Sequence, residues 1–181
     1  MGENKAFIEI EGIPLIHRIC NLFHELFEEV IIVGNEREAY STLDAKFYHD
    51  VIPNLGALGG LYTGLLVSTF HASLCVACDM PFLKKALIEY LITTLGGYDA
   101  IVPRTKDGLQ PLLGLYTKRC LEPIRKTVGE GKVRIIDFYS LAKIRILDES
   151  EFVSCDPGLE SFINVNTPEE LRSIRFKRRA F

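Results

Sequence analysis

The chain has 181 residues, of which 48% are hydrophobic and 25% are charged. These proportions are typical of one globular domain with a sizeable core. A formal net charge of −3 creates no overall field that would attract nucleic acid. Apolar runs such as 30–33 and 74–78 are far too short to span a bilayer. We therefore expect neither a nucleic-acid nor a membrane partner, and a single domain over residues 1–181.

The first half of the chain alternates helical and strand patterns. Apolar residues recur at helical spacing over 14–29, whereas a β-branched run closed by glycine predicts a buried strand at 29–34. By the same criteria we expect helices at 36–43, from 56–60 to about 70, and at 83–95, and strands at 46–49, 73–78 and 100–103.

This β-α-β-α-β-α-β order with short links predicts a mainly parallel sheet with helices on both faces. The expected fold class is α/β, a three-layer αβα Rossmann-like architecture around a mainly parallel central sheet.

The second half is less regular. A turn at 107–108 precedes an expected strand at 109–116. We then expect helices at 118–128 and 133–141, a strand at 143–147, and a final helix. The start of that helix is marked by Thr167 at the N-cap, Pro168 at the first helical position and Glu170 at the third. Together these three residues form a capping box.

The five cysteines are an odd number scattered along the chain, which fits reduced cytosolic thiols better than a disulfide framework. We therefore expect a cytoplasmic protein. Cys75 and Cys78 form a C-x-x-C pattern inside an apolar run that indicates a strand, where positions three apart point to opposite faces. No second cysteine pair or histidine pair completes a zinc site, so we favour packing over metal or redox use.

Asp79 is the strongest single candidate for chemistry. It lies at the carboxyl end of an expected buried strand, the edge at which open α/β sheets bind their ligands. A carboxylate there is costly unless it is solvated, caps a helix or binds a cation. The alternative to metal ligation is capping of the helix that begins near Leu83, although Pro81 and Phe82 make a clean cap awkward.

A glycine-rich stretch follows Asp50 and contains Gly56, Gly59 and Gly60. Glycines at a helix start let the backbone approach a ligand, and the free N–H groups there attract a phosphate or a base edge. The alternative is helix-on-helix packing through Gly59, Gly60 and Gly64. The spacing is not the G-x-G-x-x-G fingerprint, so this pattern alone is a weak signal.

Three polar residues near the two ends of the chain could also bind a ligand. Lys5, behind Gly2, could neutralise a triphosphate, although a lone N-terminal lysine is usually a solvated charge. Asn164 and Asn166 alternate along an apparent strand, so both should point to one face. Such paired amides form a turn, or they hold a polar ligand or a metal-bound water.

The C-terminus is basic on an otherwise acidic chain. Its cations form either a solvated tail or a docking site for a phosphorylated ligand or an acidic partner. These residues are Arg172, Arg175, Lys177, Arg178 and Arg179.

Taken in order, these stretches resemble the molybdenum cofactor guanylyltransferase family, within the GT-A-like nucleotidyltransferases. That family opens with a strand and a loop of the type L-A-G-G-x-S-x-R-M-G-x-x-K; residues 1–5 match the tail of the loop, and 12–15 match the segment after it. Residues 56–64 resemble its G-P-L-x-G segment, with Ala57 in place of the usual proline. Its C-D-M-P, Q-P-L-x-x-L-Y and F-x-N-I-N-T-P-E-D-L segments resemble residues 78–81, 110–116 and 162–171.

The resemblance implies a transfer of GMP from GTP to the terminal phosphate of molybdopterin, with release of pyrophosphate. It implies that Asp79 holds Mg²⁺ bridging the nucleotide phosphates and that Lys5 stabilises those phosphates. No protein nucleophile is needed, because positioning and charge neutralisation do most of the catalysis in such a transfer. Residues implied to bind the nucleotide or the pterin are Asn35 and Asp50 for the nucleoside, Gly56, Gly59 and Gly60 at the helix start, and Asn164 and Asn166 on the pterin-phosphate or metal side.

Enzymes of molybdenum cofactor biosynthesis, or client enzymes, are possible protein partners under this resemblance. We expect a monomer or a weak homo-oligomer.

One departure from the family pattern lies at the start of the chain. The first strand and the L-A-G-G half of the loop do not occur in the sequence. A parallel sheet without its first strand would expose the apolar edges of its neighbours. We therefore expect further residues upstream of Met1, rather than a short protein that has lost activity.

Other functions remain open at this point. One is a cytidylyltransferase for the same pterin, although the asparagines at 164 and 166 resemble the guanylyl branch, whereas the cytidylyl branch tends to carry aspartate there. Another is a sugar-phosphate nucleotidyltransferase. A non-enzyme alternative is a degenerate nucleotide-binding adaptor that docks through its basic tail, against which the retained Asp79 argues.

Overall fold

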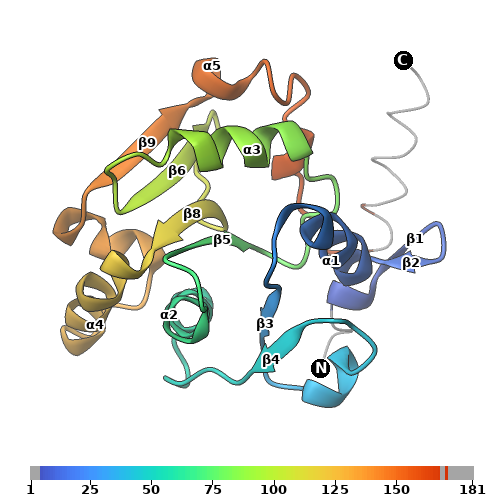
Figure 1. Ribbon diagram of the computed structural model, residues 1–181, viewed down its shortest axis with the longest axis horizontal. Coiled ribbons are helices and arrows are strands. Elements are labelled where there is room, and N and C mark those ends of the chain that lie inside the picture. Colours follow the sequence, from blue (N-terminus) through green and yellow to red (C-terminus); the bar gives the residue numbers. More distant parts are fainter. Residues whose placement is uncertain (1–4, 168–169, 171–181) are drawn as a thin grey trace.

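The largest of the three sheets formed by the described residues lies at the centre of the molecule. The computed structural model describes residues 5–167 and residue 170, and Figure 1 shows the sheet between layers of helices. β8 is antiparallel to both of its neighbours, β5 and β6, whereas β9 is parallel to β6. The strands β5, β6 and β9 therefore run in one direction. The sheet contains β5 (Ala72–Val76), β8 (Leu113–Thr117), β6 (Ala100–Thr105), β7 (Gly108–Leu109) and β9 (Ile144–Asp148).

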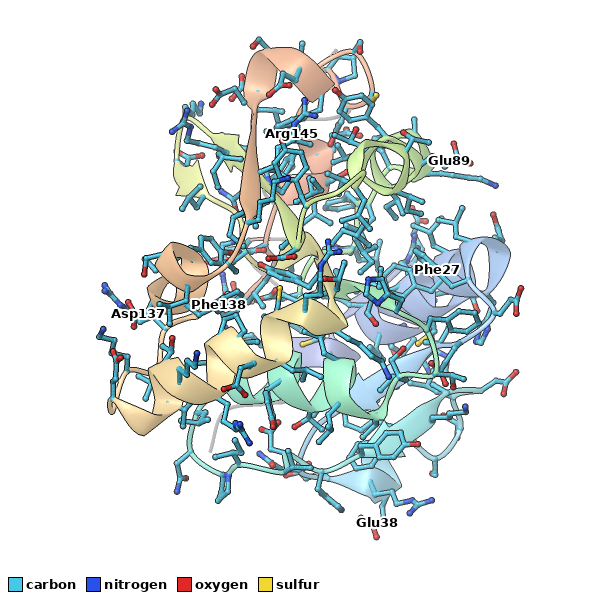
Figure 2. All side chains as sticks on the ribbon, turned by 60° about the vertical axis from the view of Figure 1, so that its left-hand side comes forward. Phe27, Glu38, Glu89, Asp137, Phe138 and Arg145 are labelled. Carbon is cyan, nitrogen blue, oxygen red and sulfur yellow. The ribbon has the colours of Figure 1, made fainter. Side chains whose placement is uncertain are left out.

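Different helices cover the two faces of this sheet. Side chains alternate along β6, so Val102 belongs to the hydrophobic cluster on one face and Ile101 to the cluster on the other. Figure 2 shows Phe138, which is fully buried in the first cluster, and the exposed Glu38 and Glu89 at the surface. The first face carries α2 (Ala57–Val67), α4 (Leu121–Gly129) and the 3-10 helix η4 (Ile135–Leu141), and the second carries α3 (Lys85–Thr94) and α5 (Glu149–Phe152). The three-layer αβα architecture predicted from the sequence is confirmed. Its central sheet is mixed, because β5, β6 and β9 are parallel to one another, whereas β7 and β8 are antiparallel to β6.

A second, two-stranded sheet pairs β3 (Ile31–Val33) with β4 (Lys46–Tyr48) in parallel. The helix α1 (Leu15–Leu26) packs on it through an apolar face that includes Ile16 and Cys20, in one cluster with Val30. Before α1 the chain forms the 3-10 helix η1 (Lys5–Phe7) and a small antiparallel pair, β1 (Glu9–Ile10) and β2 (Ile13–Pro14).

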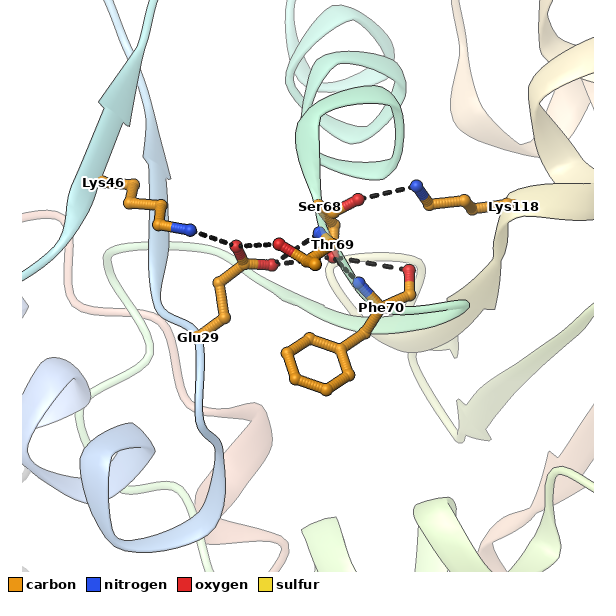
Figure 3. A network of polar contacts seen from close by, with 6 residues as sticks. All are labelled: Glu29, Lys46, Ser68, Thr69, Phe70 and Lys118. Atoms are coloured by element: carbon orange, nitrogen blue, oxygen red, sulfur yellow. Dashed lines mark hydrogen bonds and ion pairs between the residues drawn. The ribbon is translucent and has the colours of Figure 1, made fainter.

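The carboxylate of Glu29 joins the two sheets. It accepts hydrogen bonds from the backbone N–H and the hydroxyl of Thr69, both at 2.8 Å, from the Ser68 hydroxyl at 3.1 Å, and from the Lys46 ammonium at 2.7 Å (Figure 3). Burial alone would raise the pKa of Glu29, but these hydrogen bonds outweigh it and lower the pKa to about 2. Because Glu29 precedes β3 and Thr69 precedes β5, the two strands begin at the same end and run in the same direction.

The predicted strand at 109–116 is wrong in its middle. The N–H of Gln110 donates to the Pro103 carbonyl and that of Leu113 donates to the Gln110 carbonyl, so the chain turns between β7 and β8. Pro111 in this turn has no N–H to give to a ladder, which explains why one continuous strand does not form.

Three predicted helices differ in type or length. Residues 36–43 contain only the 3-10 helix η2 (Arg37–Tyr40), which buries no residue and so has no packing to extend it. In η4 the buried residues Ile135 and Phe138 are three apart, the period of a 3-10 helix. The predicted helix at 118–128 begins as the 3-10 helix η3 (Lys118–Cys120) and continues as α4.

The end of the described chain shows part of the predicted capping box. After a last 3-10 helix, η5 (Glu160–Phe162), the Thr167 hydroxyl accepts a hydrogen bond from the Glu170 N–H at 3.1 Å. The Glu170 carboxylate accepts the N–H of Asn166 instead of that of Thr167. Pro168 and the basic residues of the C-terminus lie outside the described residues. Over the described part of the chain, no helix has the length and apolar character to cross a bilayer.

Candidate active site

Asp79 follows β5 at the carboxyl edge of the central sheet. Its carbonyl oxygen accepts a hydrogen bond from the Val165 N–H at 2.8 Å. Its side-chain Oδ1 is buried and has no hydrogen-bond partner among residues 5–167 and 170. The capping alternative is wrong, because α3 begins at Lys85 and no side chain caps it. A buried carboxylate oxygen without a donor is a position that a cation can satisfy.

The bond from Val165 brings the two asparagines to Asp79. Val165 is fully buried between Asn164 and Asn166, which are both exposed. The asparagines therefore share a face, as predicted, although no regular strand forms there. The Lys5 ammonium donates to Asn166 Oδ1 at 2.6 Å. Residues from the two ends of the chain thus meet beside Asp79.

The two cysteines of the C-x-x-C pattern lie in different surroundings. Burial raises the pKa of the Cys78 thiol, the charge of Asp79 raises it further, and the charge of Lys5 lowers it. Cys78 is exposed, whereas Cys75 packs against the hydrophobic core, where burial raises its pKa to about 12. Cys78 lies beyond the end of β5, so the predicted alternation of faces does not apply to it, and packing explains Cys75 but not Cys78.

Asp50 is held against α2. The Thr63 hydroxyl accepts the N–H of Val51 at 3.1 Å and donates to Asp50 Oδ1 at 3.5 Å. Burial raises the pKa of Asp50, and the hydrogen bond from Thr63 opposes that rise. A Cβ at Gly59 would lie 3.2 Å from the Ile52 carbonyl oxygen and 3.5 Å from Asp50 Cγ. Gly59 therefore lets the loop before α2 approach closely, and the helix-on-helix alternative is wrong for this glycine.

The remaining predicted residues lie near the start of α2 or after β3. Gly56 precedes α2 with a φ of 52°, a conformation that favours glycine. Asn35 is exposed and follows Gly34, whose N–H donates to the Tyr48 carbonyl. Because β3 and β4 are parallel, Asn35 and Asp50 follow strand ends at the same edge of their sheet.

A cavity of about 670 Å³ lies between β3 and β5 and reaches from Glu29 to Asp79. Of the predicted site residues described by the structure, only Gly60 and Asp79 line it. The structure thus gathers the predicted residues into two groups, and this cavity connects them. One group is Lys5, Asp79, Asn164 and Asn166, and the other is Asn35, Asp50, Gly56, Gly59 and Gly60.

Sequence reasoning missed two residues that hold these groups in place. Thr63 supports Asp50, and its position four residues after Gly59 on the same helix face could have indicated it. Val165 fixes the asparagines to Asp79 through its backbone. No pattern in the sequence signals such a backbone bond between segments so far apart.

Known proteins resemble the chain over almost its whole length. The model of the family described as MobA-like NTP transferase domain matches residues 1–143. The molybdenum cofactor guanylyltransferase of Desulfosudis oleivorans is 34% identical over 171 residues, which cover 94% of this chain and 85% of that protein. A protein of Pelotomaculum thermopropionicum named "Probable molybdenum cofactor guanylyltransferase" is 35% identical over 175 residues, 97% of this chain and 85% of the relative.

Two solved structures have the same fold as this chain. Molybdopterin-guanine dinucleotide biosynthesis protein A from Archaeoglobus fulgidus superimposes with a TM-score of 0.82 at 23% identity, covering 98% of this chain and 91% of the other. The 2-C-methyl-D-erythritol 4-phosphate cytidylyltransferase from Thermus thermophilus gives a TM-score of 0.71 at 15% identity, with 98% and 95% covered.

The αβα architecture, with polar residues gathered at the carboxyl edge of its sheet, is the fold that these solved structures share. The matching family model makes the chain a protein with an NTP transferase domain. The chain belongs to the MobA-like NTP transferase domain family.

Proposed function

We propose that the chain transfers GMP from GTP to the terminal phosphate of molybdopterin and releases pyrophosphate. Its family and the names of its relatives support this proposal. The observation that carries it is the buried, unpaired Oδ1 of Asp79, next to the paired side chains of Lys5 and Asn166. A carboxylate oxygen that accepts no hydrogen bond among the described residues, with a lysine ammonium held beside it, suits a substrate that arrives with several phosphates and a metal ion.

Asp79 is the residue that would hold Mg²⁺. One carboxylate fits this ion, which usually keeps several waters and shares the phosphates of its substrate. Within the described residues, no group of three or more histidine, cysteine, aspartate or glutamate side chains forms a fuller metal cage. When bound, Mg²⁺ neutralises phosphate charge and polarises the phosphoryl oxygens.

The chain's own residues position the two substrates and offset their charge. Lys5, held by Asn166, supplies a positive charge for the nucleotide phosphates. Asp50, fixed by Thr63, would bind the nucleoside together with Asn35 and the backbone at the start of α2. Asn164 and Asn166 would face the phosphate of the pterin. Attack of one phosphate on another needs alignment and charge neutralisation more than a protein nucleophile.

The test measures pyrophosphate release from GTP and from CTP with purified molybdopterin and Mg²⁺. We expect turnover of GTP, and a rate at least about 100-fold lower for Asp79→Asn. Asp44→Asn is the matched control, because Asp44 is exposed and precedes β4, whereas the site residue Asp50 follows the other end of that strand. Turnover of CTP alone would favour the cytidylyltransferase alternative.

Two results would contradict the proposal. Absence of turnover with either nucleotide would favour the adaptor alternative, and a full rate for Asp79→Asn would remove Asp79 from the reaction. The cytoplasmic location, the protein partners and the weakly associating or monomeric state remain predictions from the sequence.

A further inference from the structure

Two chain segments from distant parts of the sequence meet at the candidate active site. One is the 77–84 segment, which follows β5 and contains Asp79. The other is the 156–166 segment, which follows α5 and contains Asn164 and Asn166. In Figure 1 the second segment, in orange to red, lies beside α3. The distance between Asp79 and the two asparagines therefore depends on how these two segments are joined.

Hydrogen bonds join the segments at two places. The N–H of Val165 donates to the Asp79 carbonyl, and the N–H of Lys84 donates to the Ser161 hydroxyl, both at 2.8 Å. An ion pair between the Lys84 ammonium and the Glu160 carboxylate lies beside the second bond. Because one bond lies near the start of the 77–84 segment and the other at its end, together they fix both its position and its orientation.

Apolar contacts close the same joint. Phe82 packs against the cluster that contains the fully buried Val165, and Met80, which is 2% exposed, shares a second cluster with Phe162. Hydrophobic packing has no preferred direction. It keeps the two segments in contact, and the hydrogen bonds determine which residues face each other.

The carboxylate of Asp156 orients Ser161. Its Oδ1 accepts the N–H of Glu160 at 3.0 Å, and its Oδ2 accepts the N–H of Ser161 at 2.8 Å. The Asp156 carbonyl accepts the N–H of Leu159 at 2.9 Å and closes the turn. Leu159 has a φ of 50°, a conformation that a leucine rarely adopts, so the bonds of Asp156 hold the turn in place. They thereby direct the Ser161 hydroxyl toward Lys84.

The position of Asp156 requires a carboxylate. Both of its oxygens accept backbone N–H groups, whereas an asparagine would replace one acceptor by an NH₂ donor. Asp156 and Ser161 both have 0% exposure, so they act on the site through the backbone of Lys84 and Val165 and not by touching a substrate. A buried charge is costly unless it is hydrogen-bonded, and here its bonds serve the joint between the two segments.

We propose that Asp156 and Ser161 are positioning residues that hold the 156–166 segment against the 77–84 segment. They thereby fix the two asparagines relative to Asp79. The inference rests on the proposed function, in which Asp79 holds Mg²⁺, the asparagines face the phosphate of the pterin, and the nucleoside is bound at α2. Loosening the joint should therefore impair use of the pterin and leave use of the nucleotide nearly unchanged.

Steady-state kinetics of Asp156→Asn, with molybdopterin and GTP varied separately, test this difference. We expect the KM for molybdopterin to rise at least about tenfold and the KM for GTP to change less than about twofold. An equal rise in both KM values, or a fall in kcat alone, would leave Asp156 with a purely structural role and overturn the proposal.

Asp99→Asn is the matched control. The Asp99 side chain is 19% exposed, and its Oδ2 accepts the N–H of Lys143 at 2.8 Å, so it too joins two segments through a backbone bond. Asp99 precedes β6, which is parallel to β5, and therefore lies at the edge of the sheet opposite Asp79. Its substitution should leave both KM values unchanged. The same KM changes in Asp99→Asn as in Asp156→Asn would also overturn the proposal.

Ser161→Ala is a milder variant, which keeps the carboxylate and removes only the hydroxyl that holds Lys84. It serves if Asp156→Asn does not fold, and it should raise the same KM. In the double variant the two effects should not add, because both residues act through one chain of bonds. Additive effects would show that the two residues act separately and would contradict the proposed joint.

Hydrogen exchange without substrate tests the joint independently of activity. The amides of Lys84 and Val165 should exchange at least about tenfold faster in Asp156→Asn or Ser161→Ala than in the wild type. They should be unchanged in Asp99→Asn. Unchanged exchange in the first two variants would overturn the proposal. Absence of turnover by the wild type would instead contradict the proposed transfer reaction, and the exchange rates would then decide whether Asp156 joins the segments.

Discussion

The surroundings of a single residue can lower the stability of the ligand-free protein and favour the binding of a ligand. Asp79 is the main example, because its Oδ1 is buried without a donor among the described residues. An unsatisfied buried acceptor destabilises a fold by about 1–3 kcal/mol. A bound ligand that pairs with this oxygen removes the cost. The residue therefore favours ligand binding and lowers the stability of the ligand-free protein.

Asp79→Asn should therefore raise the free energy of unfolding of the ligand-free protein by about 1 kcal/mol, because it removes the charge of a half-buried carboxylate whose Oδ1 is buried and unpaired among the described residues. Urea unfolding without metal or nucleotide measures this change. Asp44→Asn, at an exposed position, should alter the free energy by less than about 0.5 kcal/mol. A destabilised Asp79→Asn variant would mean that the native carboxylate already has a partner in solution.

Glu29 is the opposite case, because its carboxylate accepts four hydrogen bonds. Its pKa is lowered from its ordinary value of 4.5 to about 2. A lowered pKa stabilises the fold above the unfolded value, and the stabilisation is lost as the pH falls from about 4.5 towards 2. Glu29→Gln should lower the free energy of unfolding by about 2 kcal/mol at pH 7. Part of the effect is screened, since Lys46 is 58% exposed.

The pH dependence separates this charge effect from a packing effect. Urea unfolding at a series of pH values should show the difference between wild type and Glu29→Gln shrinking below about pH 4.5. Glu28→Gln, one residue earlier and exposed, should match the wild type throughout. A difference that stays constant down to pH 3 would rule out the charge as its source.

At the scale of the elements, two adjacent glycines of α2 offer a matched pair of substitutions. Gly59→Ala would place a methyl group 3.2 Å from the Ile52 carbonyl oxygen, whereas Gly60→Ala meets nothing within 4 Å. Alanine favours a helix by about 1 kcal/mol over glycine. We expect Gly60→Ala to stabilise the protein by about that amount and Gly59→Ala to destabilise it by about 1 kcal/mol. Thermal unfolding of both variants checks the prediction, and equal melting temperatures would contradict it.

The elements also show how far sequence patterns predict this fold. The strand β5 was predictable because an apolar run ends at Asp79, and α1 because its apolar face recurs at helical spacing. The position of Asp79 as a candidate ligand followed from the same pattern. The turn at Pro111 was missed because the apolar residues on both sides of it suggest one strand.

Bonds between distant segments could not be predicted from local patterns. Lys5 and Asn166 are 161 residues apart, and Glu29 and Thr69 are 40 apart. Their pairing depends on how the layers pack, and each residue alone suggests only a solvated side chain. The family resemblance named Lys5 and Asn166 as site residues, but neither it nor the local pattern indicated that they bond to one another.

At the scale of the whole molecule, the five-stranded sheet and the β3–β4 sheet differ in how they are connected to the rest of the fold. β6 is bonded on both edges and its residues Ala100, Ile101 and Val102 are fully buried, whereas β3 and β4 form a pair attached through helices and Glu29. Units with fewer buried contacts open at lower free energy than the rest of the fold. The smaller sheet should therefore open before the larger one.

Native-state hydrogen exchange measures this difference at two backbone bonds. The N–H of Lys46 donates to the Val30 carbonyl in the smaller sheet, and that of Thr117 donates to the Asp99 carbonyl in the larger. We expect the opening free energy at Lys46 to lie at least about 2 kcal/mol below that at Thr117. Glu29→Gln should lower protection at Lys46 further and leave Thr117 unchanged, because Glu29 joins the sheets without contacting β6. Equal opening free energies at both amides would show that the two sheets unfold as one unit.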